Sequence, residues 1–175
     1  VDLWGIFAPC RQLDAHRWQV DFETTVVNAS FSPREVTAES LLLAPDGSCV
    51  ARASVRQSAA AREKTVFRCR CIVTDPLLWD CEHPTLYTVR TRLFDAASTP
   101  IDRVDTRIGF RTIEITAREG LLLNGKRTFI KGVCAHQDFG LTGLAVPDNV
   151  ARHKIALIRE MGANGYRTSH YQQTE

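Results

Sequence analysis

The chain has 175 residues, of which 22 are basic and 20 acidic, so its formal net charge is +2. This length holds one domain and part of another, and it is too short for a complete (β/α)8 barrel of roughly 250 residues. Hydrophobic residues make up 44% of the sequence and charged residues 24%, a balance that excludes wholesale disorder. With charges of both signs interspersed, the composition gives no support to a nucleic-acid partner.

No apolar run approaches the ~20 residues of a membrane span, so we expect no membrane association. No basic segment followed by an apolar stretch opens the sequence, and we therefore expect no signal peptide within it.

Residues 1–111 predict a series of antiparallel strands. In the segment 16–30, apolar and polar side chains alternate, and this period of two is typical of a half-buried strand. The turn Pro45-Asp46-Gly47 ends the second expected strand, because proline fixes φ and glycine accepts positive φ. About seven strands without a helical stretch predict an antiparallel β-sandwich of ~100 residues. The expected strands are 16–30, 35–44, 50–58, 64–74, 86–95 and 101–111.

Six cysteines are spread along the chain. Cys69 and Cys71 lie two residues apart in an expected strand, which separates them by ~6.6 Å on one face. A disulfide needs Cβ atoms ~3.5–4.5 Å apart, so we do not expect these two to be bridged to each other. Together with Cys81 and His83 they have metal-ligand chemistry but lack the usual two-residue spacer, which favours reduced thiols over a zinc site.

From residue 112 onward the pattern changes. Asn124-Gly125 stands between the apolar runs 121–123 and 128–130, a strong hairpin signal because both turn residues tolerate positive φ. A short strand is expected at 131–136 and another at 163–169. Between them we predict a helix from Pro147-Asp148 to about Met161, capped by Asp148 and ended by Gly162. Strand, helix and strand form a β-α-β unit, which implies a parallel sheet.

The predicted helix has a wide apolar stripe at helical spacing. Its members are Val150, Ala151, Ile155, Leu157, Ile158 and Met161.

Five sequence motifs, taken in order, make residues 78–175 resemble glycoside hydrolase family 2, the β-galactosidases and β-glucuronidases. The first resembles the family's late sandwich strands, the second the join between sandwich and barrel, and the third a hairpin beneath the barrel. The last two resemble the first barrel strand and the end of the first helix with the second strand. They are Leu78-Trp79 with Pro84-Thr85-Leu86-Tyr87, Ile108-Gly109-Phe110-Arg111, Leu122-Leu123-Asn124-Gly125-Lys126, the run from Lys131 to Asp138, and the run from Glu160 to His170.

The resemblance implies a mainly β chain: an immunoglobulin-like antiparallel sandwich at 1–111, then the truncated first β-α-β portion of a (β/α)8 barrel at 112–175. It also implies a retaining glycosidase, which needs two carboxyl groups ~5–5.5 Å apart. In the family both are glutamates on later barrel strands, beyond residue 175. We therefore expect no catalytic residue, no metal site and no cofactor in this chain.

Three residues are candidate substrate-binding residues by the same resemblance. His136 ends the first barrel strand and His170 the second, and the C-terminal ends of barrel strands face the active site. Asp138 follows in the first loop, where its carboxylate could bond a sugar hydroxyl or hold a neighbouring loop. Arg167 is expected to hold a buried carboxylate. The family usually has a proline-containing turn after the second histidine, whereas this sequence has Tyr171-Gln172-Gln173.

Trp79 and Tyr87 could suggest a sugar-stacking platform, but their inward phase favours core packing. The leading functional hypothesis is part of a β-galactosidase, with a β-glucuronidase and a stand-alone sandwich binding module as alternatives. The expected partners are a carbohydrate substrate in the full-length enzyme and a second copy of the chain, covering the apolar surface of the barrel portion. The compartment stays open between cytoplasm and periplasm.

Overall fold

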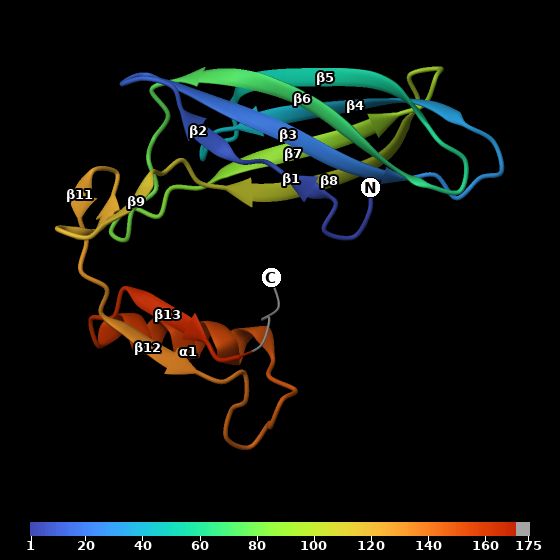
Figure 1. Ribbon diagram of the computed structural model, residues 1–175. Helices are drawn as coiled ribbons and strands as arrows, with labels where there is room; N and C mark the ends of the chain where they lie inside the picture. Colours follow the sequence, from blue (N-terminus) through green and yellow to red (C-terminus); the bar gives the residue numbers. More distant parts are fainter. Residues whose placement is uncertain (171–175) are drawn as a thin grey trace. The chain divides into compact units, whose positions relative to one another are not determined.

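The computed structural model describes residues 1–170 (Figure 1). The chain forms two compact units: Val1–Glu114 with Leu122–Gly125, and Ile115–Leu121 with the chain from Lys126 onward. Within residues 1–170, no helix is both long enough and apolar enough to span a bilayer.

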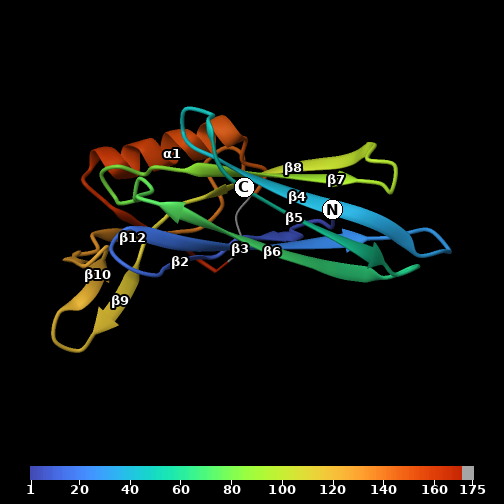
Figure 2. The same ribbon diagram turned by 90° about the horizontal axis from the view of Figure 1, so that it is seen from above.

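The first unit is a sandwich of two four-stranded antiparallel sheets, which confirms the predicted fold class. In the first sheet β3 pairs with β6, as Figure 2 shows, and with the short strands β1 and β2. The second sheet has the order β5-β4-β7-β8. The strands of the first sheet are β1 (Ile6–Phe7), β2 (Cys10–Gln12), β3 (Arg17–Val27) and β6 (Lys64–Thr74); those of the second are β4 (Arg34–Leu43), β5 (Cys49–Ala59), β7 (Tyr87–Phe94) and β8 (Pro100–Ile108).

The predicted alternation sets the core. The inward side chains of β3 are buried beside those of β6, and they face those of β4 and β7 in the second sheet. Gly47 has the positive φ expected of its turn. The strands β1 and β2 were not predicted, since two or three residues are too few to display a period. The inward set of β3 is Trp18, Val20, Phe22, Thr24 and Val26.

Phe110 is the residue on which the end of the sandwich depends. Its side chain is 0% exposed, and its ring meets Trp18 and Tyr87 edge-on at centroid distances of 5.6 and 4.9 Å. The prediction of a strand reaching residue 111 is wrong, because β8 ends at Ile108. The chain then leaves the sheet so that Phe110 enters the core, beside Leu78 in an isolated parallel bridge.

Trp79 stabilises the same corner of the sandwich through contacts with Phe110 and Arg111. Its backbone N–H donates to the carbonyl of Phe110 over 2.8 Å, and the Arg111 guanidinium lies 4.7 Å from its ring centroid. A Cβ at position 109 would lie 3.1 Å from the Trp79 side chain, so glycine allows Trp79 to approach the backbone closely there. Tyr87 lies in the core, as predicted, and its hydroxyl accepts a 2.9 Å bond from the N–H of Leu77.

The cysteines that face the sandwich core are thiols. Cys69 and Cys71 share the inner face of β6, and Cys10 packs beside them. Burial raises the pKa of the Cys71 thiol to about 11 and that of Cys10 to about 12. These groups therefore stay protonated at neutral pH, and as neutral thiols they pack as small apolar side chains.

The region after the sandwich begins with three short strands. The turn Asn124-Gly125 has the predicted positive φ at both residues, but the returning strand is 126–127 rather than the predicted 128–130. The side chain of Asn124 accepts from the N–H of Thr112 and donates to the carbonyl of Trp79, each over 3.0 Å. These strands are β9 (Ile113–Thr116), β10 (Gly120–Leu123) and β11 (Lys126–Arg127).

The second unit contains the predicted parallel β-α-β arrangement, formed by β12 (Gly132–Ala135), α1 (Asp148–Glu160) and β13 (Gly165–Thr168). The prediction that Asp148 caps the helix is wrong. Pro147 is the N-cap residue, no side chain caps the N-terminus, and Asp148 lies in the first turn. There its carboxylate is placed to interact with the positive end of the helix dipole. Gly162, with a φ of 88°, follows the last turn as predicted.

Replacing Phe110 by alanine should lower the free energy of unfolding by about 3–5 kcal/mol, because the substitution leaves a cavity between two aromatic rings. Phe7→Ala is the matched control, since Phe7 in the same sandwich is 63% exposed and should change it by less than about 1 kcal/mol. Urea unfolding followed by tryptophan fluorescence measures both. Equal losses would show that Phe110 does not anchor the core.

The His16–Asp75 pair should make stability depend on pH. The imidazole Nδ1 lies 2.7 Å from the Asp75 carboxylate, and this hydrogen bond raises the pKa of His16 above its ordinary 6.5. Its contribution should be complete below that value and disappear as the pH rises through the raised pKa, because the folded state then releases the proton. In an NMR titration Asp75→Asn should return the His16 pKa toward 6.5, whereas the distant Asp95→Asn should not. An unchanged titration in Asp75→Asn contradicts the assignment.

Candidate functional site

Two histidines lie together at the ends of the parallel strands. His136 follows β12 directly, and His170 stands two residues after β13. Their ring centroids are 5.8 Å apart and the planes cross at 81°. Both side chains are exposed. The structure thus brings together two of the three predicted substrate-binding residues, from positions 34 apart in the sequence.

The register of β12 and β13 brings the two histidines close together. Ala135 is paired with Thr168, so the two strands end level with each other. One further bond, from the N–H of Ser169 to the carbonyl of Ala135 over 3.1 Å, continues the pairing beyond β13. Ser169 is 5% exposed and anchors the backbone from which His170 projects.

Glycine at both strand starts permits the close pairing. Gly132 and Gly165 face each other in register. A Cβ at position 165 would lie 2.7 Å from the side chain of Ile130, and one at 132 would lie 3.3 Å from the carbonyl oxygen of Gly165. A side chain at position 165 would therefore have to displace Ile130, and one at position 132 would crowd the facing strand.

Lys154 on α1 holds the loop that follows β12. Its ammonium donates to the backbone carbonyl of His136 over 2.7 Å and to that of Asp138 over 3.4 Å. The lysine is half-buried, and a charged donor on a carbonyl is among the stronger protein hydrogen bonds. The helix thereby fixes the backbone that carries His136.

Asp138 and Arg167 are placed differently from the histidines. Asp138 is exposed and contributes its carbonyl to Lys154, while its carboxylate makes no hydrogen bond within residues 1–170. Arg167 is exposed, and the described part of the chain offers it no carboxylate partner. The segment Tyr171-Gln172-Gln173 lies outside the described residues.

Two positioning residues were missed by sequence reasoning. Lys154 was not distinguishable from the charged face of a helix. Asn164 ties the start of β13 to the chain before β12: its side chain accepts from the N–H of Lys131 over 2.7 Å and donates to the carbonyl of Phe129 over 3.0 Å. An asparagine just before a strand and just after a helix-ending glycine was the available signal.

The helix leaves its apolar residues uncovered. No residue of α1 is buried; Ile158 is half-buried and Ile155 is 47% exposed. The expected contact between copies through these residues stays a prediction. Among residues 1–170, no group of three His, Cys, Asp or Glu side chains is arranged to hold a metal ion.

Two imidazoles at this edge are able to hydrogen-bond hydroxyl groups. A neutral imidazole offers one donor and one acceptor, so two adjacent rings provide both kinds of contact to neighbouring hydroxyl groups. Strand-end side chains on a rigid parallel pair are also where barrel enzymes place substrate contacts.

Comparison with known proteins identifies the family. Residues 8–111 match glycosyl hydrolases family 2, and residues 113–175 match the TIM barrel domain of the same family. The chain belongs to glycosyl hydrolase family 2. The β-α-β unit is accordingly the start of the family's barrel domain, and the sandwich is the domain that precedes it.

Relatives with both specificities are similar to the chain. It is 36% identical over 167 residues to the β-galactosidase BoGH2A of Bacteroides ovatus, covering 95% of this chain and 20% of that protein. It is 34% identical over 153 residues to a β-glucuronidase of Bacteroides fragilis, covering 84% and 21%. A solved family 2 structure from Bacteroides cellulosilyticus superimposes with a TM-score of 0.89 at 31% identity, covering 97% and 22%. The chain thus spans about a fifth of each.

Removing the Lys154 ammonium should loosen the loop after β12. In Lys154→Met the carbonyls of His136 and Asp138 lose a charged donor, so local opening should become easier by about 1 kcal/mol. Amide hydrogen exchange at residues 136–139 should then accelerate roughly fivefold. Lys131→Met is the control, because Lys131 is an exposed lysine of the same unit. Unchanged exchange in Lys154→Met would remove Lys154 from the site.

Proposed function

We propose that this chain forms the sandwich and the start of the catalytic barrel of a retaining β-glycosidase that hydrolyses terminal β-galactosides. His136 and His170 would bind hydroxyl groups of the sugar. The observation that carries the proposal is the 5.8 Å approach of the two imidazoles at the C-terminal ends of neighbouring parallel strands. The similarity to a β-galactosidase over 95% of the chain favours this sugar.

The chain is proposed to have no turnover of its own. Retaining hydrolysis needs an acid/base carboxyl and a nucleophilic carboxyl on either side of the glycosidic bond. The family resemblance assigns both to glutamates on later barrel strands. The two histidines can orient a sugar, but they do not replace this pair.

A β-glucuronidase is the second candidate, favoured by the 34% identity to the B. fragilis β-glucuronidase over 84% of the chain. The two substrates differ at C6, which bears a hydroxyl in galactose and a carboxylate in glucuronate. The third alternative, a stand-alone binding module, is disfavoured because a sandwich acting alone has no need of histidines at the ends of a parallel pair.

The test compares this 175-residue chain with a longer polypeptide that continues through the barrel. We expect no hydrolysis of nitrophenyl β-galactoside or β-glucuronide by the chain alone, and hydrolysis of the galactoside by the longer protein. In the latter, His136→Ala and His170→Ala should each lower kcat/KM about 10- to 100-fold, since each leaves a substrate hydroxyl without a partner. His153→Ala, on an exposed position of α1, is the matched control.

Three outcomes would overturn parts of the proposal. Turnover by the 175-residue chain that tracks its concentration would contradict the placement of the catalytic glutamates. A preference for the glucuronide would select the second candidate. Losses in His136→Ala and His170→Ala no larger than in His153→Ala would exclude the histidines from the sugar site.

A further inference from the structure

The outer face of the sheet β5-β4-β7-β8 carries an excess of arginine. The registers of the three strand pairs place on this face every residue that alternates with the buried set. Six guanidiniums stand there against three carboxylates, a net +3, which exceeds the +2 of the whole chain. The arginines are Arg52, Arg56, Arg90, Arg92, Arg103 and Arg107, and the acids are Glu35, Glu39 and Asp105.

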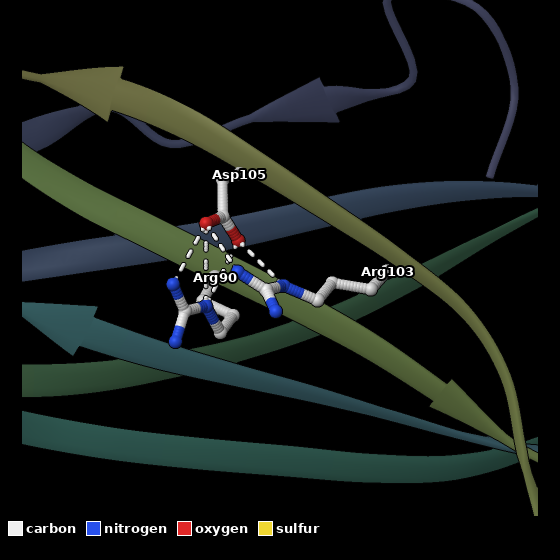
Figure 3. Close-up of polar contacts among 3 residues, drawn as sticks. All are labelled: Arg90, Arg103 and Asp105. Carbon is white, nitrogen blue, oxygen red and sulfur yellow. Dashed lines mark hydrogen bonds and ion pairs between the residues drawn. The ribbon is translucent and has the colours of Figure 1, made fainter.

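Two of the carboxylates are each shared between two arginines. Asp105 receives Arg90 through Nε at 3.0 Å and Nη2 at 2.8 Å, and Arg103 through Nη2 at 2.9 Å (Figure 3). These bonds hold the pKa of Asp105 well below its ordinary value, so it stays ionised. Each shared acid neutralises one of its two arginines.

Glu39 repeats the arrangement one strand along the sheet. Its carboxylate accepts from Nε of Arg52 over 2.6 Å and from Nε of Arg92 over 2.7 Å. The Glu39 side chain is only 10% exposed, whereas that of Arg52 is 61% exposed. At this site the negative charge is nearly buried, and the Arg52 side chain extends above it.

Two of the arginines also lie directly opposite each other on neighbouring strands. Arg92 and Arg103 are direct cross-strand partners, and like charges in that position destabilise a sheet. Arg107, opposite Thr88, is exposed and has no carboxylate partner within residues 1–170. The Glu39 and Asp105 carboxylates reduce the repulsion between Arg92 and Arg103, but the net positive charge of the face remains.

The outer face of the other sheet carries a smaller positive excess. On its outer face Asp21 is paired with Arg70, and Glu23 with Arg68. Those ion pairs lie at 3.6 and 3.3 Å. Arg11, Arg17 and Lys64 share this face. Arg17 and Lys64 pair with Asp14 and Asp2 of the adjoining loops, so five bases meet four acids and the net charge is +1. The two faces of one sandwich therefore differ in charge although they are built from the same kind of strand.

We propose that the arginine face binds a carboxylate-bearing polysaccharide and keeps the enzyme on its polymer. The guanidiniums of this face already bind carboxylates through two nitrogen atoms each. This is the geometry in which arginine binds a carboxylate most strongly. On a sheet such groups recur every ~4.8 Å across strands and ~6.8 Å along them, which suits an extended chain with a regular repeat of charge. The face has little to stack nucleic-acid bases, since its aromatic ring, Phe94, is half-buried with Arg92 5.5 Å from its centroid.

The experiment measures binding of the 175-residue chain to polygalacturonate by calorimetry at 50 and 200 mM NaCl, with neutral galactan, dextran sulfate and duplex DNA as comparison ligands. We expect binding to polygalacturonate that weakens with salt, and none to galactan. The double variant Arg103→Gln/Arg107→Gln should lose at least tenfold in affinity. Arg68→Gln/Arg70→Gln removes the same charge from the opposite face and should leave affinity unchanged.

Arg107→Gln alone provides a second variant that breaks no ion pair among the described residues, so its loss of affinity cannot come from a disturbed fold. Absence of polygalacturonate binding at 50 mM NaCl would overturn the proposal. So would equal losses in the two double variants. Tighter binding of DNA or dextran sulfate than of polygalacturonate would also overturn it, because the face would then be a general polyanion surface.

Discussion

Burial of the Phe110 ring between Trp18 and Tyr87 is the constraint on which the end of the sandwich and the exit of the chain depend. The ring belongs to the segment that leads out of the sandwich, so its burial fixes where the last strand ends and how the chain leaves. The bond from Trp79 to the Phe110 carbonyl and the two side-chain bonds of Asn124 then fix the first hairpin after the sandwich. Residues from motifs that are distant in the sequence thus contact one another and stabilise one corner of the sandwich.

The candidate sugar site depends on a different constraint, the level ending of two parallel strands. Because Ala135 is paired with Thr168, the residues after each strand emerge at the same height. Helix α1 contributes Lys154, which holds the carbonyl groups of the first loop. The positions of the two histidines are therefore set by the backbone of the strands that carry them.

The two outer faces of the sandwich are built from strands with the same alternation of side chains, but they differ in how their acidic and basic residues are paired. On the β3–β6 face every basic side chain except Arg11 has a carboxylate of its own, so the positive excess there is only +1. On the β5-β4-β7-β8 face, each of two carboxylates holds two guanidiniums, so positive charge accumulates and is ordered at the same time. Exposed ion pairs of either kind add little to stability.

Much of this protein could be read from the sequence. Alternation located the six long strands to within a few residues, because side chains on a strand face opposite sides and the buried set must be apolar. Asn124-Gly125 and Pro45-Asp46-Gly47 marked turns, since their backbone preferences are local. Apolar spacing located the helix, and the order of motifs identified the family and pointed to His136 and His170.

Tertiary structure decided what depends on distant partners. The strands β1 and β2 are too short to have a pattern, and they exist because β3 offers them a pairing edge. The end of β8 was missed because the position of Phe110 is set by Trp18 and Tyr87, not by its neighbours. Lys154 and Asn164 have the composition of ordinary surface residues until the fold presents carbonyl groups to them. The separation of the histidines and the sharing of carboxylates among arginines follow from strand register, which no single strand contains.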